Sequence, residues 1–411
     1  MVRSNDEGVA VEQSAGGAER AVREQVEPNV GSSATGAVFE AARSFTYVPE
    51  LTGLRAVAIG LVLLEHNLRV FHGGFIGVDI FFVLSGFLIT TLLVREYQQW
   101  GAIKLTHFYA RRILRLGPAL AIMLAVYLLI ALISADNRAD HMKAVLISGT
   151  YMMDWSQSLN HGPPGYLTHT WTLGVEEQFY LFWPLILIVA LRYKLTIWKV
   201  LVSLIIAVTL WRGYLVYHTG NDDAQRTYLS FDTRIDTLLF GCLIAVAPLQ
   251  RLRAVASRFP TLPLVIFALL ALVLRWDSAS MNVVGFTLVA ALAAWLLVGA
   301  MSGSSRALAS RFLRFGPVEY LGRISYGVYL WSLPIGLALA NPPGTDPHTF
   351  RAFLLTCVLT VSAAAISYHF VEQPILSRRR FTRTKPAPAD EHTPTYEVVR
   401  RFPERPAEAR P

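Results

Sequence analysis

Residues 75–94 read FIGVDIFFVLSGFLITTLLV, a run in which Asp79 is the single charged side chain. A helix of about 20 apolar residues spans the hydrocarbon core of a bilayer. Comparable runs recur from Leu51 to about Phe370, and the chain of 411 residues is 53% hydrophobic and 16% charged. Soluble domains carry about 25% charged residues. The sequence therefore predicts an all-α integral membrane protein with many spans.

About ten ranges qualify as predicted membrane spans. They are 51–71, 75–97, 116–134, 171–191, 195–217, 235–248, 261–275, 283–301, 324–340 and 352–370. A further apolar stretch, Val145 to Trp155, is too short to cross a bilayer by itself. With ten spans, Lys and Arg gather in the loops on one side, and the positive-inside tendency makes that side cytoplasmic. Both termini are then expected in the cytoplasm.

The two ends of the chain differ in composition from its apolar centre. Residues 1–45 lack apolar periodicity, and residues 377–411 are basic and Pro-rich, so we expect both to be disordered tails. Residues 46–376 form the predicted membrane domain, with no appended soluble domain. The net charge of +8 is explained by cytoplasmic loops, without a nucleic-acid partner. Two cysteines and the absence of metal-ligand spacing predict no metal site.

The first predicted span holds Arg55, Glu65 and His66. Charged and titratable groups within a span mark functional sites by default. Arg55 and His66 are eleven residues apart, which is about 16 Å along one face of a helix. Such a face suits a long substrate that reaches through the membrane. The alternative is that His66 bonds a neighbouring helix while Arg55 extends to the cytoplasmic interface.

Three further residues are expected near this face. Asp79 and Glu176 fall near the depth of His66, where a carboxylate can orient an imidazole and stabilise its charge. Ser85 is small enough for a ligand to approach closely, although helix packing accounts better for a small residue at this position. A salt-bridged structural role is the alternative for Glu176.

A basic motif follows at the inner boundary of the membrane. Arg111, Arg112 and Arg115 are spaced so that a helix clusters their guanidinium groups. Such a cluster suits the phosphates of a cytosolic ligand, or alternatively anionic lipid headgroups. On the outer side, Arg234 and Asp236 form a polar pair suited to line an acceptor site.

Taken in order, these motifs resemble the bacterial membrane-bound acyltransferase-3 family, which includes relatives of O-antigen and peptidoglycan O-acetylases and of macrolide O-acyltransferases. The resemblance covers roughly residues 47–376. It rests on Arg55 with ten residues before His66, and on motifs at 77–88, 112–115, 171–180, 233–236, 324–331 and 368–374. Ser332 stands where many members have histidine, and Thr172 replaces a usual serine.

The resemblance implies transfer of an acyl group, commonly acetyl, from acyl-coenzyme A to a hydroxyl group. Acyl-coenzyme A is then a donor substrate, and no permanently bound cofactor is expected. Expected partners are a hydroxyl-bearing glycan or glycosylated small molecule such as a macrolide, and the lipid bilayer of the bacterial plasma membrane. The Arg–His pair carries over to Arg55 and His66, and the basic motif to Arg112 and Arg115.

These expectations combine into one mechanistic hypothesis. Arg111, Arg112 and Arg115 bind the phosphates of coenzyme A, the pantetheine arm passes Arg55, and His66 acts as general base, tuned by Asp79 or Glu176. A covalent acyl-enzyme stays open. The rival is a proton-coupled transporter, because intramembrane His, Asp and Glu also build proton relays.

Overall fold

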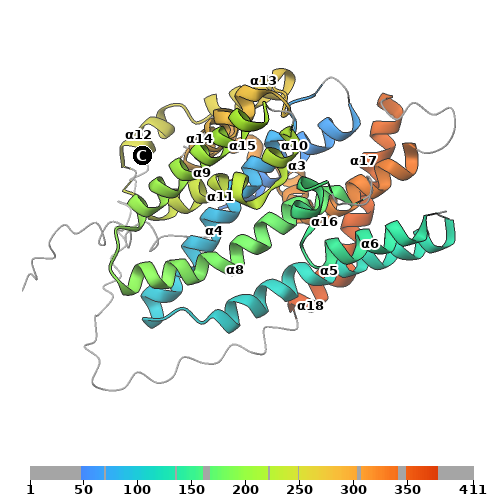
Figure 1. Ribbon diagram of the computed structural model, residues 1–411, viewed down its shortest axis with the longest axis horizontal. Helices are drawn as coiled ribbons and strands as arrows, with labels where there is room; N and C mark the ends of the chain where they lie inside the picture. Colours follow the sequence, from blue (N-terminus) through green and yellow to red (C-terminus); the bar gives the residue numbers. More distant parts are fainter. Residues whose placement is uncertain are drawn as a thin grey trace, which may run out of the picture.

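The computed structural model describes residues 48–377, except 69–70, 135–136, 161–166, 221–222, 249, 303–306 and 341–348. The predicted tails, 1–45 and 377–411, lie outside the described residues except for Ser377, which ends the last described helix. Every predicted span coincides with a helix, and Figure 1 shows these helices gathered into one bundle. The all-α prediction is confirmed for the described part of the chain.

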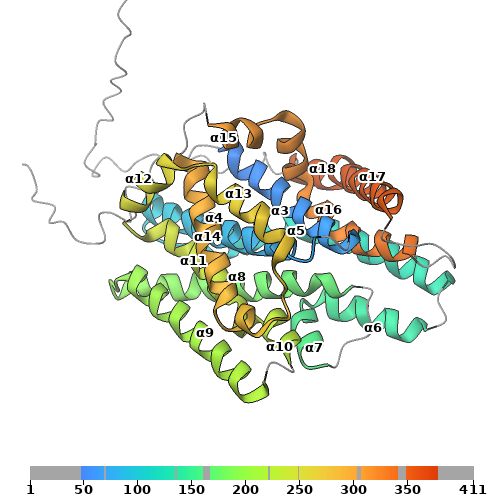
Figure 2. The same cartoon turned by 90° about the horizontal axis from the view of Figure 1, so that it is seen from above.

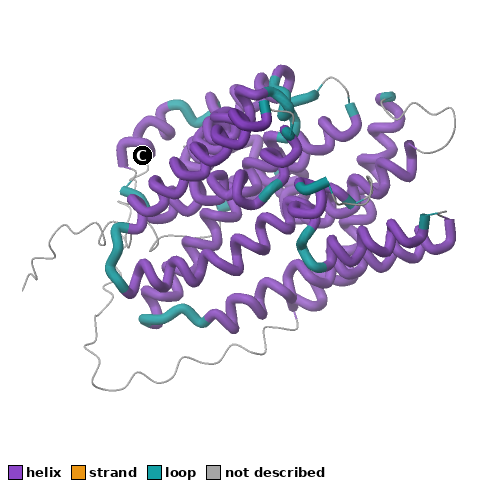
Figure 3. The backbone as a smooth tube through the Cα atoms, viewed as in Figure 1, coloured by secondary structure: helices purple, strands orange, loops and turns teal. Residues whose placement is uncertain are grey.

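Helices joined by short loops account for nearly all of the described chain, as Figure 3 shows. The α-helices are α3 Pro49–Asn67, α4 Ile76–Trp100, α5 Leu105–Ser134, α6 Arg138–Gly149, α7 Met153–Ser158, α8 Trp171–Arg192, α9 Ile197–Thr219, α10 Ala224–Leu229, α11 Phe231–Val246, α12 Gln250–Arg258, α13 Leu262–Val273, α14 Phe286–Ser302, α15 Leu308–Leu313, α16 Gly316–Ala340, α17 Phe350–Ser367 and α18 Gln373–Ser377. A 3₁₀ turn, η1, precedes α8 at Thr168–Thr170. Two π-helical segments are η2 Met281–Gly285 and η3 Tyr368–Glu372.

Six helical stretches are long and apolar enough to cross a membrane, so the chain is a multi-pass membrane protein. They are Ile76–Trp100, Leu105–Ile133, Thr168–Arg192, Ile197–Thr219, Met281–Met301 and Phe350–Ser377. The total of ten spans and the cytoplasmic termini stay predictions. Helix α3 carries three charged side chains within 19 residues, and α11 and α13 have only 16 and 12 residues.

Helix α4 lies at the centre of the bundle, where it contacts α3, α8, α11 and α14. Figures 1 and 2 show it surrounded by these neighbours in both views. Its closest crossing is with α11, because a Cβ atom on Gly86 would overlap the carbonyl oxygen of Leu238, and one on Gly241 would overlap that of Val83. Small residues permit such close approach in membrane bundles. This crossing fixes the face of α4 that Asp79 occupies.

Helices α3 and α16 also cross closely. A Cβ atom on Gly322 would overlap the carbonyl oxygen of Thr52, and one on Gly53 would overlap that of Leu313 in α15. The crossing brings the N-terminal halves of α3 and α16 together. Arg55 Nε consequently donates a hydrogen bond to Ser325 Oγ at 3.2 Å.

The short helix α7 supports the first turns of α8. Gln178 Nε2 donates to both carboxylate oxygens of Asp154 at 3.0 Å, and Trp155 Nε1 donates to Gln178 Oε1 at 3.0 Å. Burial raises the pKa of the Asp154 carboxyl to about 6. These contacts hold α8 in the rotation that points Glu176 into the bundle.

Candidate active site

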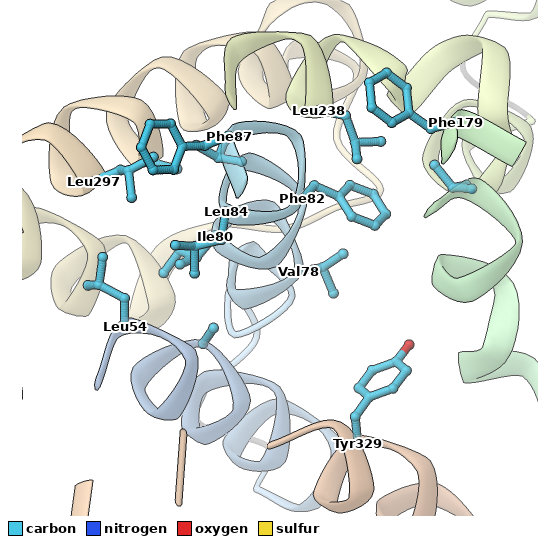
Figure 4. Close-up of a cluster of buried hydrophobic side chains, with 14 of the residues drawn as sticks. Leu54, Val78, Ile80, Phe82, Leu84, Phe87, Phe179, Leu238, Leu297 and Tyr329 are labelled. Carbon is cyan, nitrogen blue, oxygen red and sulfur yellow. The ribbon is translucent and has the colours of Figure 1, made fainter. Parts of the chain in front are cut away.

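A cavity of about 120 Å³ lies inside the bundle between α3, α4, α5, α8 and α16. One wall is apolar, and Figure 4 shows its residues Val78 and Phe82 on the side of α4 that faces Tyr329 of α16. The polar lining contains most of the residues expected to bind the donor, together with one expected catalytic carboxylate. These are Arg55, Ser85, Arg112, Arg115 and Glu176.

The polar wall is organised by the two adjacent glutamates of α8. Consecutive residues of a helix point about 100° apart, so Glu176 and Glu177 contact different partners. Ser85 Oγ donates to Glu176 Oε1 at 2.6 Å, and Arg112 Nε donates to Glu177 Oε1 at 2.9 Å. The guanidinium of Arg112 also lies over the ring of Tyr180, 3.1 Å from its centroid. Arg112 is therefore neutralised and held by α8.

Arg115 differs from Arg112 in its surroundings. Its side chain is exposed to the cavity, and within the described part of the chain no hydrogen bond or carboxylate within 4.0 Å holds it. Among the described residues, the hydrogen bond of the Arg55 guanidinium goes to a neutral hydroxyl, that of Ser325. Arg55 and Arg115 are accordingly the two cations of this site that are available to an anion.

Arg55 and Arg115 also line a second, larger cavity of about 450 Å³. Its other walls come from the start of α3, the first turns of α16 and the first residue of η3: Thr52, Glu319, Gly322, Arg323 and Tyr368. The two cavities thus adjoin at the two guanidinium groups. A ligand that occupies both cavities lies against these two guanidinium groups.

Arg111 does not join its neighbours. Its Nη2 lies 3.2 Å from Glu96 Oε2, its side chain is 48% exposed, and it lines neither cavity. The predicted basic cluster is therefore divided, with Arg112 and Arg115 facing inward and Arg111 facing the end of α4.

His66 lies at the C-terminal end of α3 and is exposed. The structure brings neither Asp79 nor Glu176 into contact with it. Its electrostatic neighbour is His169, whose ring lies 5.4 Å from that of Tyr329. Because Tyr329 lines the smaller cavity, His66 lies near the Tyr329 wall of that cavity, towards the other end of α3 from Arg55.

Asp79, Arg234 and Asp236 are fully buried in ion pairs, and none of them lines either cavity. Arg234 Nη2 lies 2.8 Å from Asp79 Oδ1, and its guanidinium lies over the ring of Phe286 at 3.8 Å. Asp236 is paired with Arg212 of α9 at 3.1 Å. In this structure the expected acceptor-side pair joins α4, α9, α11 and α14.

Several lining residues were not singled out from the sequence as site residues. Thr172 Oγ1 donates to the hydroxyl of Tyr329 at 2.7 Å, and that hydroxyl donates to the carbonyl of His169. Tyr180, Ser325 and Tyr326 complete the polar wall. All except His169 lie within motifs quoted above, 171–180 and 324–331, so the motifs located them without indicating what each side chain contacts.

These helices and their polar interior define a multi-pass membrane protein with a cationic cavity inside its bundle. Residues 48–370 match the family described as an acyltransferase domain, so the chain belongs to the acyltransferase-3 family, as its motifs predicted. It is accordingly a multi-pass bacterial membrane protein.

Curated relatives are similar over most of this chain. The peptidoglycan O-acetyltransferase OatA of Listeria monocytogenes is 34% identical over 353 residues, covering 80% of this chain and 56% of the relative. The O-acetyltransferase OatA of Staphylococcus aureus is 34% identical over 348 residues, covering 80% and 57%. YrhL of Bacillus subtilis is 32% identical over 365 residues, covering 82% and 56%. The chain thus spans little more than half the length of these relatives, and no solved structure matches it.

Proposed function

We propose that this protein is a membrane-embedded O-acyltransferase that moves an acyl group, acetyl in the simplest case, from acyl-coenzyme A to a hydroxyl of a carbohydrate acceptor. The observation that carries the proposal is the pair of adjoining cavities with Arg55 and Arg115 at their junction. Membership in the acyltransferase-3 family supports the reaction class.

The donor fits the charge distribution of the site. Coenzyme A carries phosphates at one end and a thioester on a neutral arm at the other. Arginine binds phosphate through charge-assisted and often bidentate hydrogen bonds. Arg115, exposed and without a carboxylate partner in the described chain, is the phosphate ligand we favour within the basic motif. The neutral arm then lies along Val78 and Phe82, with the thioester directed toward Thr172 and Tyr329.

His66 is the proposed general base. It removes the proton from the acceptor hydroxyl, whose oxygen attacks the thioester carbonyl carbon. The tetrahedral intermediate collapses with cleavage of the carbon–sulfur bond, and the coenzyme A thiolate takes the proton back from His66. His66 is exposed and does not line the smaller cavity, which supports this role because an acceptor reaches it without entering the space proposed for the donor.

Glu176 is proposed to act on the donor side rather than on His66. Its carboxylate accepts the hydrogen bond from Ser85 at the cavity wall. That bond orients the Ser85 hydroxyl and keeps an anion near Arg55 and Arg112. We therefore treat Glu176 and Ser85 as positioning residues for the acyl end of the donor.

The acceptor we propose is an envelope glycan. The Listeria relative is a peptidoglycan O-acetyltransferase, and the Staphylococcus relative is an O-acetyltransferase. A glycosylated small molecule of the macrolide type is the second acceptor class to test.

The proposal is tested with purified wild-type protein reconstituted in lipid. Release of free thiol from acetyl-coenzyme A is measured with soluble peptidoglycan fragments, with a macrolide glycoside and without acceptor, and the products are analysed for acetyl esters. We expect acceptor-dependent thiol release and an O-acetylated glycan. The reaction is repeated without acceptor, using acetyl-coenzyme A that is radiolabelled in the acetyl group. Label that stays on the protein would show an acyl-enzyme route instead of direct transfer.

Donor binding is measured separately as a rise in the melting temperature, since a ligand that binds only the folded state stabilises it. Acetyl-coenzyme A should raise the Tm of wild type and of Arg311→Ala, whose exposed side chain lies outside both cavities. It should have little effect on Arg115→Ala. If wild type shows neither thiol release nor stabilisation, the acyltransferase proposal is wrong.

The transporter alternative finds less support. A proton relay needs carboxylates that exchange protons with water along a path. Asp79 and Asp236 are fully buried and paired with arginine, so neither carboxylate is exposed to water. Proton uptake coupled to solute movement in vesicles, without acyl transfer, would favour the transporter.

A further inference from the structure

The larger cavity carries more positively than negatively charged side chains on its walls. Its walls carry three guanidinium groups, Arg55, Arg115 and Arg323, and one carboxylate, Glu319. Arg323 Nη2 lies 2.9 Å from Glu319 Oε1, one turn earlier on α16, and half of the Arg323 side chain is exposed. The carboxylate of Glu372 is within electrostatic range of Arg55 and Arg115. The cations outnumber the carboxylates, so the cavity attracts an anion.

Volume distinguishes the two cavities. Sites that hold small organic ligands measure about 300–1,000 Å³. The larger cavity, at about 450 Å³, falls in this range, whereas the smaller cavity, at about 120 Å³, holds only a narrow segment of a ligand. The walls of the smaller cavity are mainly apolar, whereas those of the larger cavity are polar and apolar in nearly equal parts. A ligand with a bulky anionic end and a slender neutral arm matches both.

Tyr368 adds an aromatic surface to the larger cavity. It is half-buried and begins the π-helical segment η3, where the backbone of α17 departs from α-helical geometry. Single π-helical turns are frequent at functional sites. A tyrosine ring on a cavity wall offers a stacking surface for a nucleobase, and such stacking tolerates any base.

We infer that the larger cavity binds the nucleotide end of the coenzyme A donor, with Arg115 and Arg323 on its phosphates and Tyr368 against its adenine ring. This inference rests on the proposed function. It places a second set of donor contacts on α16 and η3, outside the basic motif of α5. The close crossing of Gly322 with Thr52 fixes the wall that these contacts share.

The test compares two donors, acetyl-coenzyme A and S-acetylpantetheine, which lacks the nucleotide. Arg323→Ala should raise the KM for acetyl-coenzyme A about tenfold or more, as expected for loss of a charge-assisted contact. It should leave kcat, and the KM for S-acetylpantetheine, unchanged. Arg311→Ala, a cation outside both cavities, should change neither KM.

Tyr368 is tested with a conservative and a non-conservative variant. Tyr368→Phe keeps the ring and should retain the wild-type KM for acetyl-coenzyme A, whereas Tyr368→Leu should raise it. Adenosine 3′,5′-bisphosphate should compete with acetyl-coenzyme A in wild type and stabilise it thermally. Both effects should weaken in Arg323→Ala.

An equal change of KM for both donors, or no change for either, would overturn the nucleotide assignment. An equal change would instead indicate a structural role or a bound lipid phosphate, which assays in neutral and in anionic lipid separate. In either case wild type still transfers acetyl. If wild type uses neither donor and binds no acetyl-coenzyme A, the proposed function itself has failed.

Discussion

The carboxylate of Asp79 lies 2.8 Å from Arg234, not beside His66. Asp79 and Arg234 are 155 positions apart in the chain, and both are fully buried. Helix rise places Asp79 near the depth of His66, but rise fixes only the depth of a side chain. The direction in which it points depends on the rotation of α4, and α4 packs this face on α11.

This pairing leads to a prediction about stability. Asp79→Ala leaves the Arg234 cation buried without a carboxylate, and breaking a buried pair costs about 3–5 kcal/mol. We expect a large fall in the melting temperature of the solubilised protein. The double variant Asp79→Ala with Arg234→Leu should regain much of the lost melting temperature.

The same measurement separates structure from catalysis. If Asp79→Ala keeps the wild-type melting temperature and yet loses acyl transfer, Asp79 acts in catalysis and the structural assignment is wrong. Arg212 and Asp236 offer a second buried pair for comparison.

At the scale of the elements, the crossing of α4 with α11 holds the centre of the bundle. The Sγ of Cys242 lies 3.6 Å from the carbonyl oxygen of Gly86, so the two backbones run in close contact. The polar residues Asp79 and Ser85 leave the same helix on different faces, toward Arg234 and Glu176 respectively. A change in this crossing therefore moves both contacts.

Gly86→Ala is predicted to destabilise the protein, because its methyl group would overlap the carbonyl oxygen of Leu238. Overpacking of this kind typically costs about 1–3 kcal/mol. Gly60→Ala is the matched control in α3, since a Cβ there meets no atom within 4 Å. Thermal unfolding of the two variants checks the prediction. Equal melting temperatures would contradict the close crossing.

The helical ranges were predictable from sequence because the bilayer imposes two strict conditions. Backbone groups must be bonded within the helix, and a span needs a long apolar run. The neighbours of each side chain were not predictable. Arg111 and Arg115 are four residues apart, yet Arg111 pairs with Glu96 of α4 while Arg115 lines both cavities. Such contacts depend on how separate helices pack.

For the molecule as a whole, most residues of the site were predictable from the sequence, but their arrangement in the fold differs from the predicted one. The predicted donor residues Arg55, Ser85, Arg112 and Arg115 do meet at one cavity. The three residues predicted to act together lie apart. His66 is exposed, Asp79 is in a buried ion pair, and Glu176 lines the smaller cavity. Shared depth was the only signal available for that triad.

The proposed donor-binding residues and the proposed general base lie in different parts of the molecule. Arg55, Arg115 and Arg323 line the larger cavity, and His66 lies towards the other end of α3 from Arg55. In the function proposed, the donor enters at the larger cavity and the acceptor approaches His66. The direct prediction is that His66 is required for transfer and dispensable for donor binding.

The decisive measurement is the rate of acetyl transfer by His66→Ala, compared with His72→Ala, an exposed histidine that lines neither cavity. Loss of a general base costs about 100-fold or more. We predict that loss for His66→Ala, with acetyl-coenzyme A still raising its melting temperature, and wild-type rates for His72→Ala. A folded, membrane-inserted His66→Ala protein with wild-type rates would contradict the mechanism.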